Sequence, residues 1–264
     1  MKSKLFIIAT FIFTQLQAQE WVKKNRIDIR DVITAFSYDD QENIYLATAR
    51  AEVVRCDHTG SETLRFSWPN SGFFNLIEAR NNLNTFCFSR DNQSFIYLDR
   101  FLANPNNYLV SEFSEAYSWL VAPALDQNFW LLQHSPPSLL KIDRRFRTLI
   151  QEVQLPFDFE LEDAVFFKAQ KGALLLVDRV KGVYVFDLFG NPLASLSMAG
   201  AEYAHISDNT IIAYSNGLLH MRSVESESVI TIEAPQGYRA TIRMADRYYF
   251  ISNNHVDVFQ YVNP

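Results

Sequence analysis

The sequence has few cysteines, few glycines and fewer basic than acidic residues, and each shortage narrows the function classes open to it. It contains 2 Cys and 8 Gly in 264 residues, with 24 Lys and Arg against 30 Asp and Glu. No spacing typical of a zinc site occurs. A net charge of −6 argues against a nucleic acid partner, because phosphates attract a basic surface.

The sequence also lacks the short motifs of common enzymes. It has no Gly-x-Ser-x-Gly elbow, no glycine-rich phosphate loop and no His-Glu-x-x-His pair. No long stretch after the N-terminus has apolar residues at helical spacing, whereas aromatic residues make up 14% of the chain. Aromatic and β-branched residues favour strands, so we expect an all-β protein. Because no phosphate-binding loop or metal-binding motif occurs, we expect no cofactor.

Cys56 and Cys87 lie in separate apolar, strand-like segments. Cysteines in such positions are most often buried and unpaired, which is the interpretation that we favour. A disulfide between them is the alternative, which an exported protein would permit.

The N-terminus has the features of a signal peptide. Two lysines precede an apolar run at 5–13, which is too short to span a bilayer, and Leu16-Gln17-Ala18 resembles a cleavage site. We predict a signal peptide at 1–18 and export to the periplasm, the outer membrane surface or the medium, with an uncleaved anchor helix as the alternative. No later apolar run is long enough to be a transmembrane segment.

Six similar segments follow one another along the rest of the chain. Their most apolar strands start 41, 44, 45, 37 and 37 residues apart, close to the length of a propeller blade. Polar turns rich in Asn, Asp and Gly precede most of these strands, as tight hairpins require. The strands occupy residues 43–48, 84–89, 128–133, 173–178, 210–215 and 247–252.

The period predicts a single six-bladed β-propeller domain at 19–264. The last segment has only three strands, and residues 20–27 form a strand without a partner, so we expect the N-terminal strand to complete the last blade and close the ring. A β-sandwich or an open solenoid is the alternative. The predicted blades are residues 32–68, 74–111, 116–156, 161–199, 201–234, and 238–264 with 20–27.

Third strands of the first four segments end in an aspartate, namely Asp57, Asp99, Asp143 or Asp187. These carboxylates lie in separate hairpins and do not converge on one ion, so Asx-turns are their favoured role.

The pattern of strand, Asp, turn and strand, as in Val183-Tyr-Val-Phe-Asp-Leu-Phe-Gly190, resembles that of six-bladed propellers of the NHL-like kind. With Gln19-Glu20-Trp21 after the signal, the chain is similar to secreted propellers of Bacteroidetes-type bacteria. The resemblance implies an architecture and no particular activity.

Some six-bladed propellers are calcium-dependent lactonases with carboxylate and amide ligands at the inner ends of several blades. Among the innermost strands read from this sequence only Glu78 is acidic, so we predict no metal site. His205 and His220 fall in strands, where we expect them to satisfy local hydrogen bonds.

One face of the propeller is predicted to gather arginine and aromatic residues. Turns between second and third strands lie on the same face as the connections between blades, and these residue types are enriched in protein interfaces. The alternative is that these turns are simply polar and the aromatics fold onto the core. The turn residues are Arg50, Arg90, His134 and Arg179, and the connection residues are Trp68, Phe73, Phe157 and Tyr238.

The favoured function is therefore a non-catalytic binding or scaffold module of the bacterial cell envelope. Its partner is predicted to be a protein, with a glycan as the alternative ligand. The competing function is a propeller hydrolase, similar to a lactonase, that acts at the mouth of the central channel.

Overall fold

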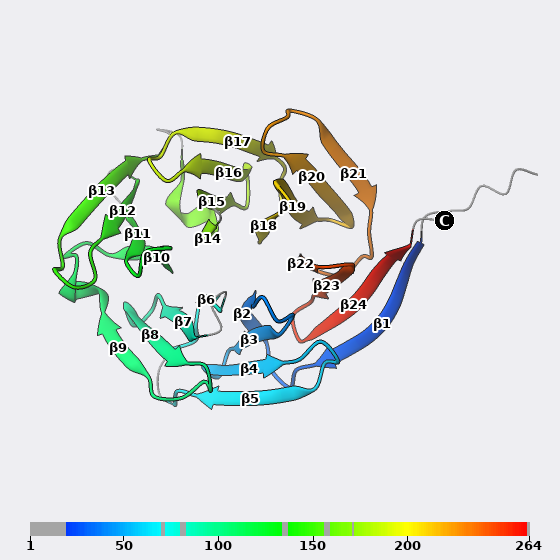
Figure 1. The fold of residues 1–264 in the computed structure, drawn as a ribbon, viewed down its shortest axis with the longest axis horizontal. Helices are drawn as coiled ribbons and strands as arrows, with labels where there is room; N and C mark the ends of the chain where they lie inside the picture. Colours follow the sequence, from blue (N-terminus) through cyan, green and yellow to red (C-terminus); the bar gives the residue numbers. More distant parts are fainter. Residues whose placement is uncertain are drawn as a thin grey trace, which may run out of the picture.

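A computed structural model describes residues 20–69, 72–79, 83–133, 137–155, 159–170 and 172–262. Within these residues 24 strands form six four-stranded antiparallel sheets, arranged in a ring around a central axis (Figure 1). The chain is thus an all-β, six-bladed propeller, as the sequence predicts. The proposed signal peptide lies outside the described residues and stays a prediction. In the part of the chain that the structure describes, no helix is long and apolar enough to cross a membrane.

Each blade runs from an inner strand at the axis to an outer strand at the circumference. The first three blades are β2 (Ile33–Tyr38), β3 (Ile44–Thr48), β4 (Glu52–Cys56) and β5 (Glu62–Ser67); β6 (Leu76–Glu78), β7 (Asn84–Ser89), β8 (Ser94–Asp99) and β9 (Asn106–Leu109); β10 (Ser118–Pro123), β11 (Phe129–Gln133), β12 (Ser138–Ile142) and β13 (Leu149–Gln154). The other three are β14 (Ala164–Gln170), β15 (Ala173–Asp178), β16 (Gly182–Asp187) and β17 (Pro192–Ser197); β18 (Ala204–Ser207), β19 (Thr210–Ser215), β20 (Leu218–Ser223) and β21 (Val229–Glu233); β22 (Ala240–Met244), β23 (Arg247–Ile251), β24 (His255–Val262) and β1 (Glu20–Asp28). Short 3-10 helices at Val110–Glu112 and Leu161–Asp163 lie in connections between blades.

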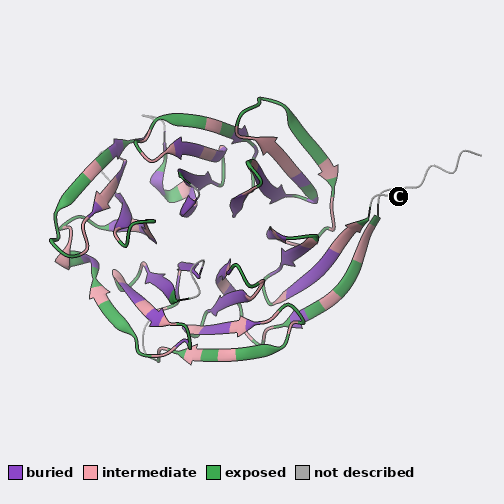
Figure 2. Ribbon diagram, viewed as in Figure 1, coloured by how far each residue is buried: buried purple, intermediate pink, exposed green. Residues whose placement is uncertain are grey.

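Burial changes systematically from the axis to the circumference (Figure 2). Every residue of the second strands β3, β11 and β15 is buried, because neighbouring blades cover both faces of these strands. Outer strands such as β5 and β13 are largely exposed. The core therefore consists of apolar side chains packed between adjacent blades.

β1 pairs with β24 and closes the ring, as predicted. The register places Trp21 opposite Tyr261 and Lys23 opposite Phe259, with a bulge between Lys23 and Asn25. The Trp21 ring also makes edge contacts with Tyr248 at 4.9 Å, and its indole nitrogen donates a hydrogen bond to a backbone oxygen of the preceding blade. Closure covers the edge of β24 that would otherwise expose unpaired backbone groups.

Hairpins between third and fourth strands contain the predicted Asx-turns. The Asp57 carboxylate accepts hydrogen bonds from the backbone of Thr59 and Ser61, and Asp187 accepts them from Phe189 and Asn191. Asp99 makes the same turn without a glycine, because Leu102 adopts a positive φ of 52° in its place. Scarcity of glycine therefore does not interrupt the repeat.

Cys56 and Cys87 are both buried and form no disulfide. The favoured interpretation of two unpaired thiols is confirmed.

Candidate functional site

A cavity of about 450 Å³ opens where the inner strands begin, at one mouth of the central channel. All six blades contribute to its wall, so the site exists only in the closed ring. The residues that determine its shape and charge are Thr34, Phe36, Asn75, Arg90, Trp119, Glu162, Phe166, Arg179, Glu202, Tyr203 and Arg239.

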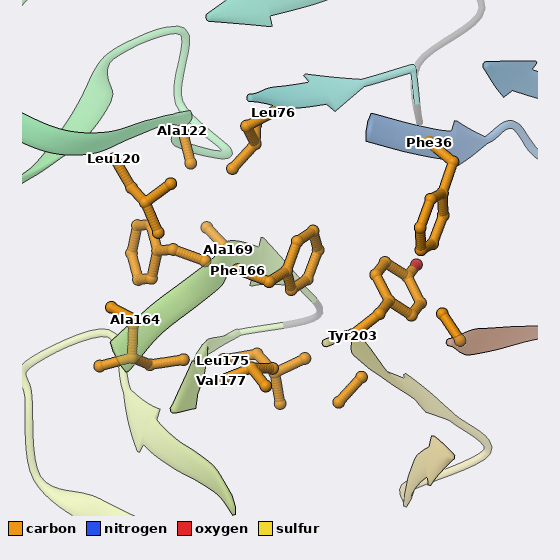
Figure 3. Close-up of a cluster of buried hydrophobic side chains, with 14 of the residues drawn as sticks. Phe36, Leu76, Leu120, Ala122, Ala164, Phe166, Ala169, Leu175, Val177 and Tyr203 are labelled. Carbon is orange, nitrogen blue, oxygen red and sulfur yellow. The ribbon is translucent and has the colours of Figure 1, made fainter. Parts of the chain in front are cut away.

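Three aromatic rings in contact form one apolar side of the cavity. The Tyr203 ring lies 4.5 Å from that of Phe166 and 4.8 Å from that of Phe36, measured between centroids. Figure 3 shows Phe36 and Tyr203 pointing toward each other from separate blades, with Phe166 beside them. Tyr203 precedes β18, whereas Phe36 and Phe166 belong to β2 and β14, so this surface depends on packing between blades.

Arg90 and Trp119 form a fixed pair on one side of the mouth. The guanidinium carbon lies 3.8 Å from the centre of the indole ring, and Arg90 Nε donates a hydrogen bond of 2.7 Å to the Trp119 backbone oxygen. Trp119 Nε1 in turn donates to the Ala164 oxygen at 2.8 Å. These contacts join the turn after β7 to β10 and β14 and hold the guanidinium plane over the ring.

Arg239 is anchored on the opposite side by groups from two other blades. It donates a hydrogen bond of 2.6 Å to the Ile33 oxygen and forms an ion pair of 3.1 Å with Glu202. This charge is therefore largely neutralised by its own neighbour.

Arg179 lies at the tip of the turn between β15 and β16. The Asp178 carboxylate accepts hydrogen bonds of 2.8 Å from the backbone of Val180 and Lys181, which shapes the turn. The Arg179 amide donates a hydrogen bond to the Asp163 oxygen, which ties the turn to the connection that carries Glu162. The side chains of Arg179 and Glu162 are both exposed at the rim of the cavity.

Two of the predicted interface residues, Arg90 and Arg179, line this cavity. Arg50 does not, because its side chain is 79% exposed and pairs with Asp31 at 3.5 Å. The other three described residues also lie outside the cavity: Trp68 packs against Phe66, Phe73 is 36% exposed, and the Tyr238 hydroxyl donates to Asp257. His134 and Phe157 fall outside the described residues.

Sequence reasoning missed Trp119, Glu202 and Arg239. Each occupies the first positions of an inner strand or the residues just before it, which is where the repeat brings all six blades to the channel mouth. That shared position in the repeat is the signal that could have identified them.

Glu78, the acidic residue noted on the inner strands, forms an ion pair of 3.0 Å with Lys168 of β14, and both side chains are buried. The Lys168 ammonium also lies 4.8 Å from the Tyr38 ring centre. His205 is buried as well, and its Nε2 accepts a hydrogen bond from the Arg243 amide. Within the described residues no group of three or more His, Cys, Asp or Glu is arranged to hold a metal ion.

Comparison with known proteins identifies the fold but no family. No protein-family model matches the sequence, and no curated protein sequence matches it either. A catalytically inactive virginiamycin B lyase from Staphylococcus aureus, solved with quinupristin, is similar in structure with a TM-score of 0.64, 8% identity and coverage of 92% of this chain and 100% of its own. A streptogramin B lyase matches with a TM-score of 0.63, 8% identity and coverage of 92% and 98%. BamB from Moraxella catarrhalis matches with a TM-score of 0.51, 13% identity and coverage of 87% and 86%. At these identities the likeness concerns the fold alone.

Proposed function

We propose that the protein is an exported binding module of the cell envelope that recognises a protein partner at the channel mouth. The observation that carries the proposal is the cavity of about 450 Å³, to which all six blades contribute arginine and aromatic side chains. Volumes of this size are typical of ligand sites, and arginine and tryptophan are the residue types that most often dominate binding energy. The resemblance to secreted NHL-like propellers supports an exported protein.

Capture of the partner from a native extract of the source cells tests this proposal. Immobilised wild-type protein is compared with the double variant Arg90→Ala/Arg179→Ala and with Arg145→Ala, which alters an exposed arginine on the β12–β13 hairpin outside the cavity. A partner identified by mass spectrometry should be lost with the double variant and retained with Arg145→Ala. Equal capture by all three proteins would contradict the proposal, and loss of capture after enzymatic deglycosylation of the extract would identify a glycan ligand.

A second candidate function is an enzyme that acts in the same cavity. Two of the similar structures are lyases, which supports this candidate at the level of the fold. Recovery of the bound molecule separates the two functions: a binding module releases it unchanged, whereas an enzyme releases a product of different structure, which chromatography and fragmentation in the mass spectrometer would show even if the mass is unchanged.

A further inference from the structure

The two sides of the channel mouth differ in how their arginines are paired. Arg239 has Glu202 as its partner. Neither Arg90 nor Arg179 forms an ion pair with any acidic side chain of the described part of the chain. The Nε of Arg90 is used by the Trp119 oxygen, so the four N–H groups of its terminal nitrogens remain to bind a ligand.

The surroundings of the Arg90 guanidinium favour binding of an anion over hydration by water alone. Its side chain is half-buried, and burial lowers the pKa of the guanidinium, with Tyr117 and Asp91 acting in the opposite direction. A partly desolvated cation without a counter-ion is unfavourable, and an anion that hydrogen-bonds to it compensates this cost. Stacking on Trp119 already holds the guanidinium in one orientation, so less entropy is lost when a planar carboxylate binds.

The remainder of the cavity calls for an apolar group beside that anion. The Tyr203 ring lies within 5 Å of the Phe36 ring and of the Phe166 ring, and these three side chains carry no charge. Arg239, on the opposite side of the same cavity, already pairs with Glu202, which disfavours a second negative group there. One anionic group attached to an apolar or aromatic body therefore fits the wall best.

We propose that the channel mouth binds a monocarboxylate whose acid group lies between Arg90 and Arg179 and whose apolar group packs on Phe166 and Tyr203. This inference rests on the proposed function and names the chemistry that the site recognises. Two kinds of molecule carry such a carboxylate. One is a protein partner whose C-terminal residue is apolar, and the other is a small aromatic acid.

Calorimetric titration with N-acetylphenylalanine tests the proposal, with N-acetylphenylalaninamide as the matched ligand that lacks the charge. The acid should bind at least about tenfold more tightly than the amide, because a charge-assisted hydrogen bond contributes about that factor. Arg90→Gln and Arg179→Gln should each weaken the acid by about tenfold, whereas Arg50→Gln, a control on an equivalent turn outside the cavity, should not. Equal affinity for acid and amide, or no binding of either, overturns the proposal.

Thermal unfolding of each variant shows whether it is folded. If Arg90→Gln does not fold, Arg90→Lys provides a second test of the role of Arg90. Lysine keeps the charge but loses the planar pair of donors, so binding should be weakened and still depend on the carboxylate. If Arg90→Lys bound the acid no more tightly than the amide, the proposal would be contradicted.

A short peptide that ends in phenylalanine distinguishes the two sources. Tighter binding of the peptide acid than of N-acetylphenylalanine assigns the site to a protein C-terminus, and the reverse order assigns it to a small acid. If neither acid binds while the partner of the capture experiment still depends on Arg90 and Arg179, the carboxylate proposal fails and the proposed function stands.

Discussion

Asp257 is buried between the first and last strands, where the side chains of Arg26, Lys23 and Tyr238 approach its carboxylate closely and His255 Nε2 lies 3.6 Å away. Arg26 donates to both oxygens at 2.7 and 2.8 Å, Lys23 lies at 2.8 Å, and the Tyr238 hydroxyl donates at 2.6 Å. Burial alone would raise the pKa of Asp257, but the hydrogen bonds from Arg26, Lys23 and Tyr238 outweigh it and hold the pKa well below the usual range.

We predict that Asp257→Asn lowers the free energy of unfolding by about 2 kcal/mol at pH 7. Because the folded-state pKa is lowered, the stabilisation is complete above the unfolded-state pKa of about 4 and is lost as the pH falls through the folded value. The difference between wild type and variant, measured by urea unfolding, should therefore shrink below about pH 4. A difference that is constant from pH 7 to pH 2 would show that the carboxylate charge has no part in closure.

The two cysteines allow a second test at the scale of single residues. Desolvation raises the pKa of Cys56 to about 11, and burial also raises the pKa of the fully buried Cys87. Thiolates are the reactive species, so neither thiol should react with iodoacetamide at pH 7.5 in the native protein. Mass spectrometry should find both thiols modified only after unfolding, and rapid modification of the native protein would contradict their burial.

At the scale of one element, β16 begins at a glycine that the hairpin requires. Gly182 has a φ of 118°, and a Cβ there would meet the backbone of Leu196 and Met198 in and after β17. We predict that Gly182→Ala destabilises the protein by about 2–4 kcal/mol, because both strain and a backbone clash oppose the methyl group. The matched control is Gly237→Ala, where φ is 89° but the space is open, and about 1 kcal/mol is expected from the positive φ alone. Equal losses in chemical unfolding would contradict this explanation.

The blades could be predicted from the sequence because each one repeats the same strand and turn pattern, and the unpaired strand at residues 20–27 indicated closure. Arg90 and Arg179 could be predicted because turns have a fixed place in that repeat. Trp119 and Arg239 also have a fixed place in the repeat, at or just before the start of inner strands, but the orientation of their side chains could not be predicted, because it depends on the Ala164 and Ile33 oxygens of other blades. Contacts between segments so distant in the chain leave no local pattern.

At the scale of the whole molecule, the ring depends on its first strand. A chain that starts at residue 29 would lack β1, expose the edge of β24 and leave Asp257 without Arg26 and Lys23. We expect this chain to unfold at a lower temperature and to associate through the open edge, as size-exclusion chromatography would show. A monomer with the melting temperature of the chain that starts at residue 20 would contradict a closing role for β1.

A partner bound at the channel mouth would shield the wall of the cavity from solvent. Hydrogen exchange of the propeller, followed by mass spectrometry with and without the purified partner, measures this shielding. We expect slower exchange at residues 34–36, 88–91, 117–120 and 162–166, which form the wall of the cavity or adjoin it. Protection confined to the hairpins between third and fourth strands, with unchanged exchange at the mouth, would contradict this expectation.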